Sequence, residues 1–283
     1  MQSILLQPPW LHSLAALSYL GLAAHFWRTR WRGAVLDQPV KGLLGWERAW
    51  LVIALSFHGL TLGSEVHQFG SESTRFGFAI ALSLMMWLAV AFYWIESFYA
   101  RMEGLQMLGL PLAAVCVLLP LLIPSQHILI KAGSSAFRMH LLMAMLAYSL
   151  FTLAALHAIL MAVAEKRLHR GRMTPLFASL PPLLTMEALL FRLIHIAFAL
   201  LTLTLASGVL FSEQIFDKPL PFNHKTVFAI LSWLIFAALL FGRHRYGWRG
   251  RKALRWTLAG FGVLLLAYVG SRFVLEVLLG RPA

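Results

Sequence analysis

The sequence predicts an all-α protein, a polytopic helix bundle embedded in a membrane. Of its 283 residues, 60% are hydrophobic and only 12% are charged. A soluble domain of this length must cover its surface with polar side chains and cannot bury so large an apolar fraction. The apolar residues also gather into stretches of roughly 20 residues, the length that crosses the hydrocarbon core of a bilayer. We therefore expect a single membrane domain over residues 1–283.

Eight stretches are apolar enough to be transmembrane helices. They cover residues 10–27, 47–67, 75–95, 104–123, 139–163, 187–211, 225–241 and 254–278. The first has basic residues after it and none before it, the reverse of a cleavable signal peptide, so we expect it to be a retained helix. Pro111 and Pro120 interrupt the fourth stretch. Prolines are tolerated in membrane helices when neighbouring helices satisfy the freed carbonyl groups.

The distribution of basic residues predicts how the helices are oriented. The formal net charge is +13, and most of the cations lie in the loops after the first, fifth and seventh stretches. Lysine and arginine gather in cytoplasmic loops, so these three loops are predicted to be cytoplasmic and both termini non-cytoplasmic. The cations alternate with apolar stretches, which disfavours nucleic-acid binding and suits contact with anionic lipid. They are Arg28, Arg30, Arg32 and Lys41; Lys166, Arg167, Arg170 and Arg172; and Arg243, Arg245, Arg249, Arg251, Lys252 and Arg255.

The sequence carries no motif of an enzyme. Cys116 is the only cysteine, which excludes an intrachain disulfide, a CxxC redox pair and a CxxCH haem-attachment motif. Walker A, GxGxxG, HExxH and GxSxG motifs are all missing. We therefore predict that the chain is not an enzyme and has no catalytic residues.

Histidines are the candidate functional residues, because the chain has 11 of them and few other polar side chains. Ionisable groups at membrane depth usually mark a functional site, and histidine is a common axial ligand of haem iron. His58 in the second helix and His195 in the sixth are predicted at similar depths, where they could bind the two faces of a planar macrocycle. Alternatively, each could bond a neighbouring hydroxyl or carbonyl group as a packing contact.

Two more histidines are expected at the outer membrane surface. His140 begins the fifth helix and His224 the seventh, where they could form a second haem or metal site open to solvent, or simply be solvated. Arg192, in the first turns of the sixth helix, is expected to extend toward the cytoplasmic interface, with a haem propionate as its alternative partner. Four histidines have no pairing that the sequence predicts: His12, His25, His127 and His157.

Part of the sequence resembles a known family. Leu193–Phe198, followed by Leu200–Thr204 and Ser207-Gly208, is similar to one helix of the CcsA/ResC-type cytochrome c assembly proteins. Residues 139–275 carry the resemblance best, and the first four helices share only its general character. The other matching segments keep the family's order and approximate spacing: Met139–Leu142, Ala147-Tyr148, Lys225-Thr226, Ser232–Ala237, Gly247–Arg251 and Tyr268–Gly270.

The resemblance implies a protein of the bacterial cytoplasmic (inner) membrane that holds or passes haem b and supports cytochrome biogenesis. His58, His195, His140 and His224 are then the candidate haem ligands. Two features of the haem-delivering synthetase subunits are missing. The loop from Ser212 to Pro219 lacks the tryptophan-rich WWD segment, and no histidine follows the last helix. The sequence therefore resembles the smaller YpjD/HemX-like branch of the family.

Two other functions remain open at this level. The chain could be a cofactor-free accessory protein that binds or stabilises a partner protein, with Arg249, Arg251 and Lys252 as a docking surface. A transporter of ions or metabolites is favoured only by the polytopic architecture, because transporters commonly have paired broken helices and only the fourth helix is broken here.

Overall fold

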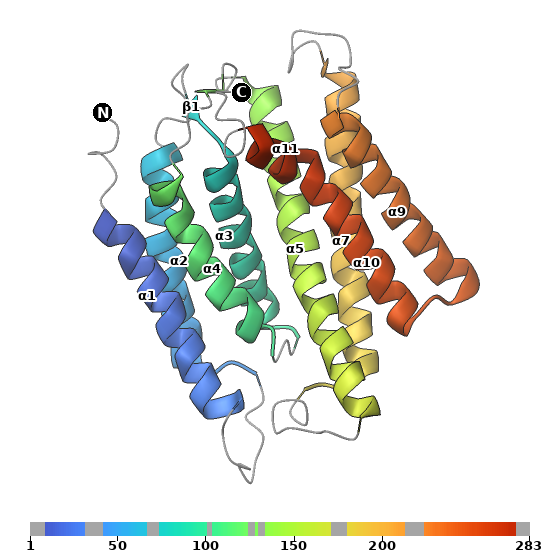
Figure 1. Ribbon diagram of the computed structural model, residues 1–283, viewed down its shortest axis with the longest axis horizontal. Coiled ribbons are helices and arrows are strands. Elements are labelled where there is room, and N and C mark those ends of the chain that lie inside the picture. Colours follow the sequence, from blue (N-terminus) through green and yellow to red (C-terminus); the bar gives the residue numbers. More distant parts are fainter. Residues whose placement is uncertain are drawn as a thin grey trace.

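The computed structural model describes residues 9–31, 42–66, 74–100, 104–123, 128–129, 134–170, 180–212 and 224–275. These residues form a bundle of long helices that run side by side (Figure 1). The helices are α1 (Pro9–Phe26), α2 (Gly45–Val66), α3 (Phe78–Glu96), α4 (Gln106–Leu122), α5 (Ser135–His169), α7 (Leu183–Leu210), α9 (His224–Tyr246) and α10 (Gly250–Leu265). The all-α prediction is confirmed, and each of these helices overlaps its predicted range.

Three short elements extend this set. The π-helix η2 (Trp27–Trp31) continues α1, and the π-helix η3 (Leu266–Gly270) joins α10 to α11 (Ser271–Phe273). The sequence did not predict the strand pair, in which β1 (Thr74–Arg75) lies antiparallel to β2 (Ile128–Leu129).

The bundle has two groups of helices with α5 between them. Figure 1 shows α1 to α4 on one side of α5 and α7, α9 and α10 on the other. The largest interface joins α5 to α7, and α3 is the main contact of α5 with the first group. We call the end of the bundle where Phe26, His169 and Gly250 lie the basic end, and the opposite end the far end.

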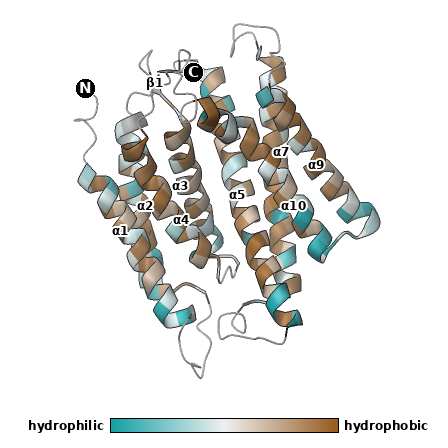
Figure 2. Cartoon of the chain, in the orientation of Figure 1, coloured by the Kyte–Doolittle hydropathy of each residue, from teal (hydrophilic) through white to brown (hydrophobic). Residues whose placement is uncertain are grey.

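The helix surfaces suit a bilayer. Within the described ranges, five helices are long and apolar enough to cross a membrane: α3, α5, α7, α9 and the continuous segment from α10 to α11. Figure 2 shows apolar residues along the middle of the bundle and hydrophilic residues concentrated at the ends of helices. α1 packs against α2 and against the shorter apolar helix α4, and both of these pack against α3.

Small residues bring α9 and α10 close together. A Cβ atom at Gly260 would lie 2.9 Å from the ring of Phe236 and 3.1 Å from Ile235, so no larger residue fits without movement. The hydroxyl of Ser232 donates to the carbonyl oxygen of Gly260 at 3.0 Å. Close backbone approach of this kind is how helices associate in membranes, where apolar burial gives little driving force.

Polar side chains of neighbouring helices donate to backbone carbonyl groups in α4 and α10. The buried His12 of α1 donates from Nδ1 to the Val117 oxygen of α4 at 2.7 Å, just before Pro120. In α10, the hydroxyl of Tyr148 donates to the Leu264 oxygen at 2.8 Å, just before η3. His12 therefore has a packing role that the sequence did not predict.

Candidate functional site

His195 lies on an open face of α7 and has the geometry of a metal ligand. Its ring is exposed, and Nδ1 donates to the Phe191 carbonyl oxygen one turn earlier, at 2.6 Å. This bond places the ring proton on Nδ1 and leaves the Nε2 lone pair directed outward. Among the described residues Nε2 has no hydrogen-bond partner. Metal-binding histidines characteristically donate their second ring nitrogen to a carbonyl or carboxylate group.

The open face of α7 is a continuous stripe. Its five exposed residues follow the helical repeat, and we call them the α7 stripe: Arg192, His195, Ala199, Thr202 and Ala206. The small Ala199, one turn after His195, leaves space beside the imidazole. Leu190, Ile194, Ala197 and Leu201, which are buried, form the other face of the helix.

Two different kinds of side chain border His195. Toward the basic end, Arg192 forms an ion pair with Glu96, the last residue of α3. Toward the far end, Phe198 stacks on Trp233 of α9 with ring centroids 5.6 Å apart, and the Trp233 indole donates to the Thr202 hydroxyl at 2.9 Å. The imidazole thus lies between a charged pair and a flat aromatic surface.

His58 has a different environment. It is fully buried in α2, with Nδ1 3.1 Å from the Tyr19 hydroxyl and Nε2 2.9 Å from the Ser83 hydroxyl. These contacts tie α1, α2 and α3 together, as the packing interpretation predicts. Ligation of iron by His58 would require one of the two hydrogen bonds to break.

The structure does not bring His58 and His195 into one site. α2 packs mainly on α1 and α3, whereas α7 packs mainly on α5 and α9. α3 and α5 lie between α2 and α7 (Figure 1). A similar depth in the membrane therefore does not make the two histidines neighbours, and their pairing stays a prediction.

His140 and His224 both lie at the far end, on the two helices that flank α7. The half-buried His140 donates from Nδ1 to the Ser207 hydroxyl at 2.9 Å, because that hydroxyl already donates to the Thr204 oxygen. His140 thus also carries its lone pair on Nε2. His224 is the exposed first residue of α9, and the segment before it, which includes most of the predicted loop at 212–219, lies outside the described residues.

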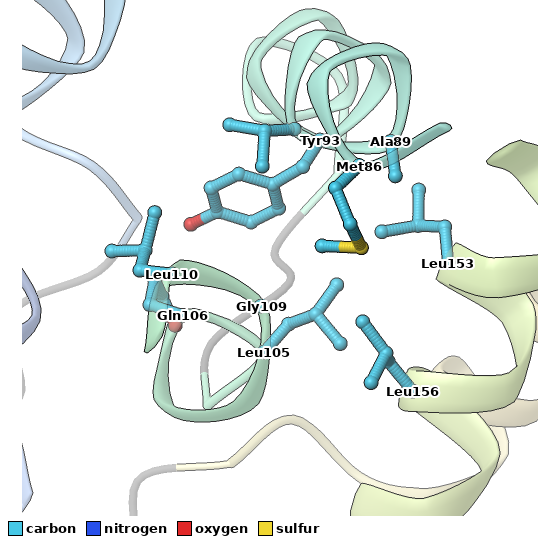
Figure 3. Close-up of a pocket in the computed structure, with 10 residues that line it drawn as sticks. Met86, Ala89, Tyr93, Leu105, Gln106, Gly109, Leu110, Leu153 and Leu156 are labelled. Carbon is cyan, nitrogen blue, oxygen red and sulfur yellow. The ribbon is translucent and has the colours of Figure 1, made fainter. Parts of the chain in front are cut away.

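A cavity between α3, α4 and α5 is too small for a macrocycle. Its volume is about 20 Å³, enough for one water molecule. Figure 3 shows Met86, Tyr93, Leu105 and Leu153 around it, with Gln106 as the polar neighbour. A large planar ligand such as a macrocycle therefore does not fit this cavity.

Other histidines that the sequence left unassigned have clear partners. His25 contacts the buried Glu47 at 3.0 Å, and Arg30 contacts the same carboxylate at 2.5 Å. His157 donates to the Met186 oxygen at 3.0 Å and joins α5 to α7. Glu47, an acid at the start of the second helix, was the signal in the sequence for the contact with His25. His127 lies outside the described residues.

The basic run after α9 is largely occupied by contacts within the chain. The carboxylate of Glu187, in the first turns of α7, accepts hydrogen bonds from Arg243 at 2.6 Å, from Arg249 at 2.9 Å and from the Gly250 N–H at 3.2 Å. We call these four residues the Glu187 clasp. The sequence analysis missed it, although Glu187 was an acid at the predicted cytoplasmic start of the sixth helix, on the same side of the membrane as the GWRGR run.

Two more cations of this run, Arg251 and Lys252, have neighbours of their own. Arg251 contacts Glu165 of α5 at 2.8 Å, and the Lys252 ammonium lies 3.6 Å from the centre of a Trp248 ring. These contacts hold the basic end together, so they disfavour a surface kept free for docking.

Comparison with known proteins identifies the family. The sequence profile of the cytochrome C assembly proteins matches residues 46–279. The chain belongs to the cytochrome c assembly protein family. The match begins in the second helix, earlier than the segment that carried the resemblance most clearly.

Relatives in the family agree with this assignment. The chain is 28% identical to the inner membrane protein YpjD of Escherichia coli over 248 residues, which cover 84% of this chain and 92% of that protein. It is 34% identical to the cytochrome c biogenesis protein CcsA of Thermosynechococcus vestitus over 86 residues, 30% of this chain and 27% of that protein. No solved structure matches the chain. With five membrane-length helices in the part of the chain that the structure describes, the protein is an inner-membrane protein of this family.

Proposed function

We propose that this protein holds haem b on the α7 stripe, with Nε2 of His195 as an iron ligand, and thereby supports cytochrome biogenesis without bond-making chemistry of its own. The observation that carries the proposal is the outward lone pair of His195, set by the bond from Nδ1 to Phe191, in a chain of the cytochrome c assembly family. Bound haem would supply the redox-active iron, and the protein would supply its orientation and a water-poor surface.

Membrane energetics support an occupant at this face. A polar imidazole exposed toward lipid is costly, and such residues usually face a partner or a ligand. A planar macrocycle would cover His195 and the small Ala199, and could rest against the stacked Phe198 and Trp233 rings. The face thus provides a ligand atom and a flat apolar border.

The other predicted ligands would serve elsewhere. His140 and His224 are proposed to form a second haem-iron site at the far end, reached from the aqueous phase. His58 is proposed as a ligand only in a state where it has released Tyr19 or Ser83. In the state described here it acts as a packing residue.

The proposed orientation places the basic end in the cytoplasm. Lysine and arginine are concentrated there, so both termini would be non-cytoplasmic and all eight helices would cross the membrane. Exposed cations at this end suit contact with anionic lipid headgroups: Arg28, Lys166, Arg170, Arg245 and Arg255.

Absorption spectra test the proposal. We expect the protein purified from haem-supplemented cells to show a Soret band and a reduced-minus-oxidised spectrum of haem b. His195→Ala should lose most of this signal, while His58→Ala should keep it and unfold more easily. His169→Ala is the matched control, because Nδ1 of His169 also donates to a carbonyl one turn earlier, at 2.8 Å, but at the solvated end of α5.

Two outcomes would refute the assignment. Loss of the Soret band in His58→Ala with retention in His195→Ala would move the intramembrane site to the first helix group. If the wild type binds no haem, the cofactor-free accessory protein becomes the better interpretation.

A further inference from the structure

We propose that Arg192 is an anion-binding residue for a haem propionate, and that Glu96 occupies it until haem arrives. This inference rests on the proposed haem site at His195. Arg192 would be a second anchoring point for the macrocycle and would set which of its edges faces the basic end. The ion pair between Arg192 and Glu96 of α3 would then be exchangeable.

The position of Arg192 suits this role. It precedes His195 by three residues on the same exposed stripe of α7, so the two backbones are only about 4.5 Å apart along the helix axis. Side chains three apart on a helix are neighbours. A ligand held by His195 would therefore extend within reach of the guanidinium group on its basic-end side.

Arg192 has hydrogen-bonding capacity to spare. A guanidinium group has five N–H donors, and among the described residues only one contact uses them, from one terminal nitrogen to a Glu96 oxygen. The side chain is 48% exposed, compared with 17% for Glu96. The guanidinium group can thus donate to a second carboxylate, in the bidentate geometry that arginine favours.

Glu96 is poorly placed to be a permanent partner. It is the last residue of α3, where the partial negative charge of the helix C-terminus opposes a carboxylate. Arg192 lies nine residues into α7, roughly 14 Å along the axis, where an uncompensated cation would be costly. Glu96 therefore neutralises Arg192 in the absence of ligand, while its own site weakens the pair.

The two borders of His195 match the two edges of haem. The cation lies on the basic-end side, and Phe198, Trp233 and Thr202 lie on the far-end side. Haem carries both carboxylates on one edge and apolar substituents on the other. Its carboxylates would face Arg192 and the basic end, and its apolar edge would face the aromatic pair.

Haem dimethyl ester provides the test, because its carboxylates are esterified while its iron is unchanged. Titration of detergent-solubilised wild type should show haem binding roughly 10- to 100-fold tighter than the ester, the range of one charge-assisted contact. Arg192→Gln should weaken haem binding by the same factor and leave ester binding unchanged. Arg192→Lys should have a haem affinity between those of the wild type and Arg192→Gln, because lysine keeps the charge but cannot bind a carboxylate bidentately. Glu96→Gln should tighten haem binding by removing the competing carboxylate.

The outcomes separate this inference from the proposed function. A wild type that binds neither haem nor ester overturns both. Binding of both compounds with equal affinity, or an equal loss for both in Arg192→Gln, overturns the role of Arg192 and leaves His195 as ligand. Thermal unfolding of the apo variants serves as the fold control, and recovery of haem selectivity in Arg192→Lys would show that charge at this position is the cause.

Discussion

Replacement of Glu187 by alanine should destabilise the basic end more than replacement of any one of its partners. The carboxylate is buried and accepts three hydrogen bonds. The Arg243 side chain is only 29% exposed, so its charge-assisted bond should contribute about 1.5–3 kcal/mol. Arg249 is 54% exposed and solvent screening limits its pair to about 1 kcal/mol or less.

Together, the bonds from Arg243, Arg249 and the Gly250 N–H mean that Glu187→Ala should lower the free energy of unfolding by about 3–4 kcal/mol. This is similar to the cost of breaking a buried ion pair. Such a loss should lower the midpoint of thermal unfolding by about 10 °C. The assay is tryptophan fluorescence of the purified protein in detergent during heating. Arg249→Ala is the matched comparison and should lower the midpoint by only about 2–3 °C. Equal effects of the two substitutions, or no effect of Glu187→Ala, would show that the clasp does not stabilise the bundle.

Two further substitutions test helix packing. Gly260→Ala should lower the free energy of unfolding by about 1–3 kcal/mol, because its Cβ would lie 2.9 Å from Phe236. Gly262 has open space around it, so Gly262→Ala should instead raise the free energy of unfolding by about 0.5–1 kcal/mol through helix propensity. Equal changes in unfolding midpoint would contradict the proposed close approach. Tyr148→Phe should cost about 1 kcal/mol, because the Leu264 carbonyl loses its donor, and an unchanged midpoint would show that the carbonyl finds another partner.

The sequence predicts the helices well because each is a long apolar stretch, and it predicts their ends less well. The last helix was expected from residue 254 and begins at Gly250, whose N–H is held by Glu187 from another helix. The fifth was expected to end at 163 and continues to His169 through polar residues, one of which, Glu165, contacts Arg251. Apolar length identifies the spans, but contacts between helices decide where they end.

The candidate site is predictable only in part for a related reason. Residue number along a helix gives the depth of His58 and His195, but it does not give the neighbours of each helix within the membrane. Nor does it reveal which ring nitrogen is available. The bond from His195 to Phe191 and the two bonds of His58 separate a side chain that can accept a ligand from one that is already satisfied.

The turn between α9 and α10 has a consequence for biosynthesis. Gly247 and Gly250 both have positive φ, and Trp248 lies where a Cβ at Gly242 would be, so the two helices form a hairpin closed by three residues. Glu187 lies in α7, which the ribosome completes before this hairpin exists. The nascent chain therefore carries an uncompensated carboxylate until Arg243 and Arg249 emerge, and the arrival of the hairpin neutralises it.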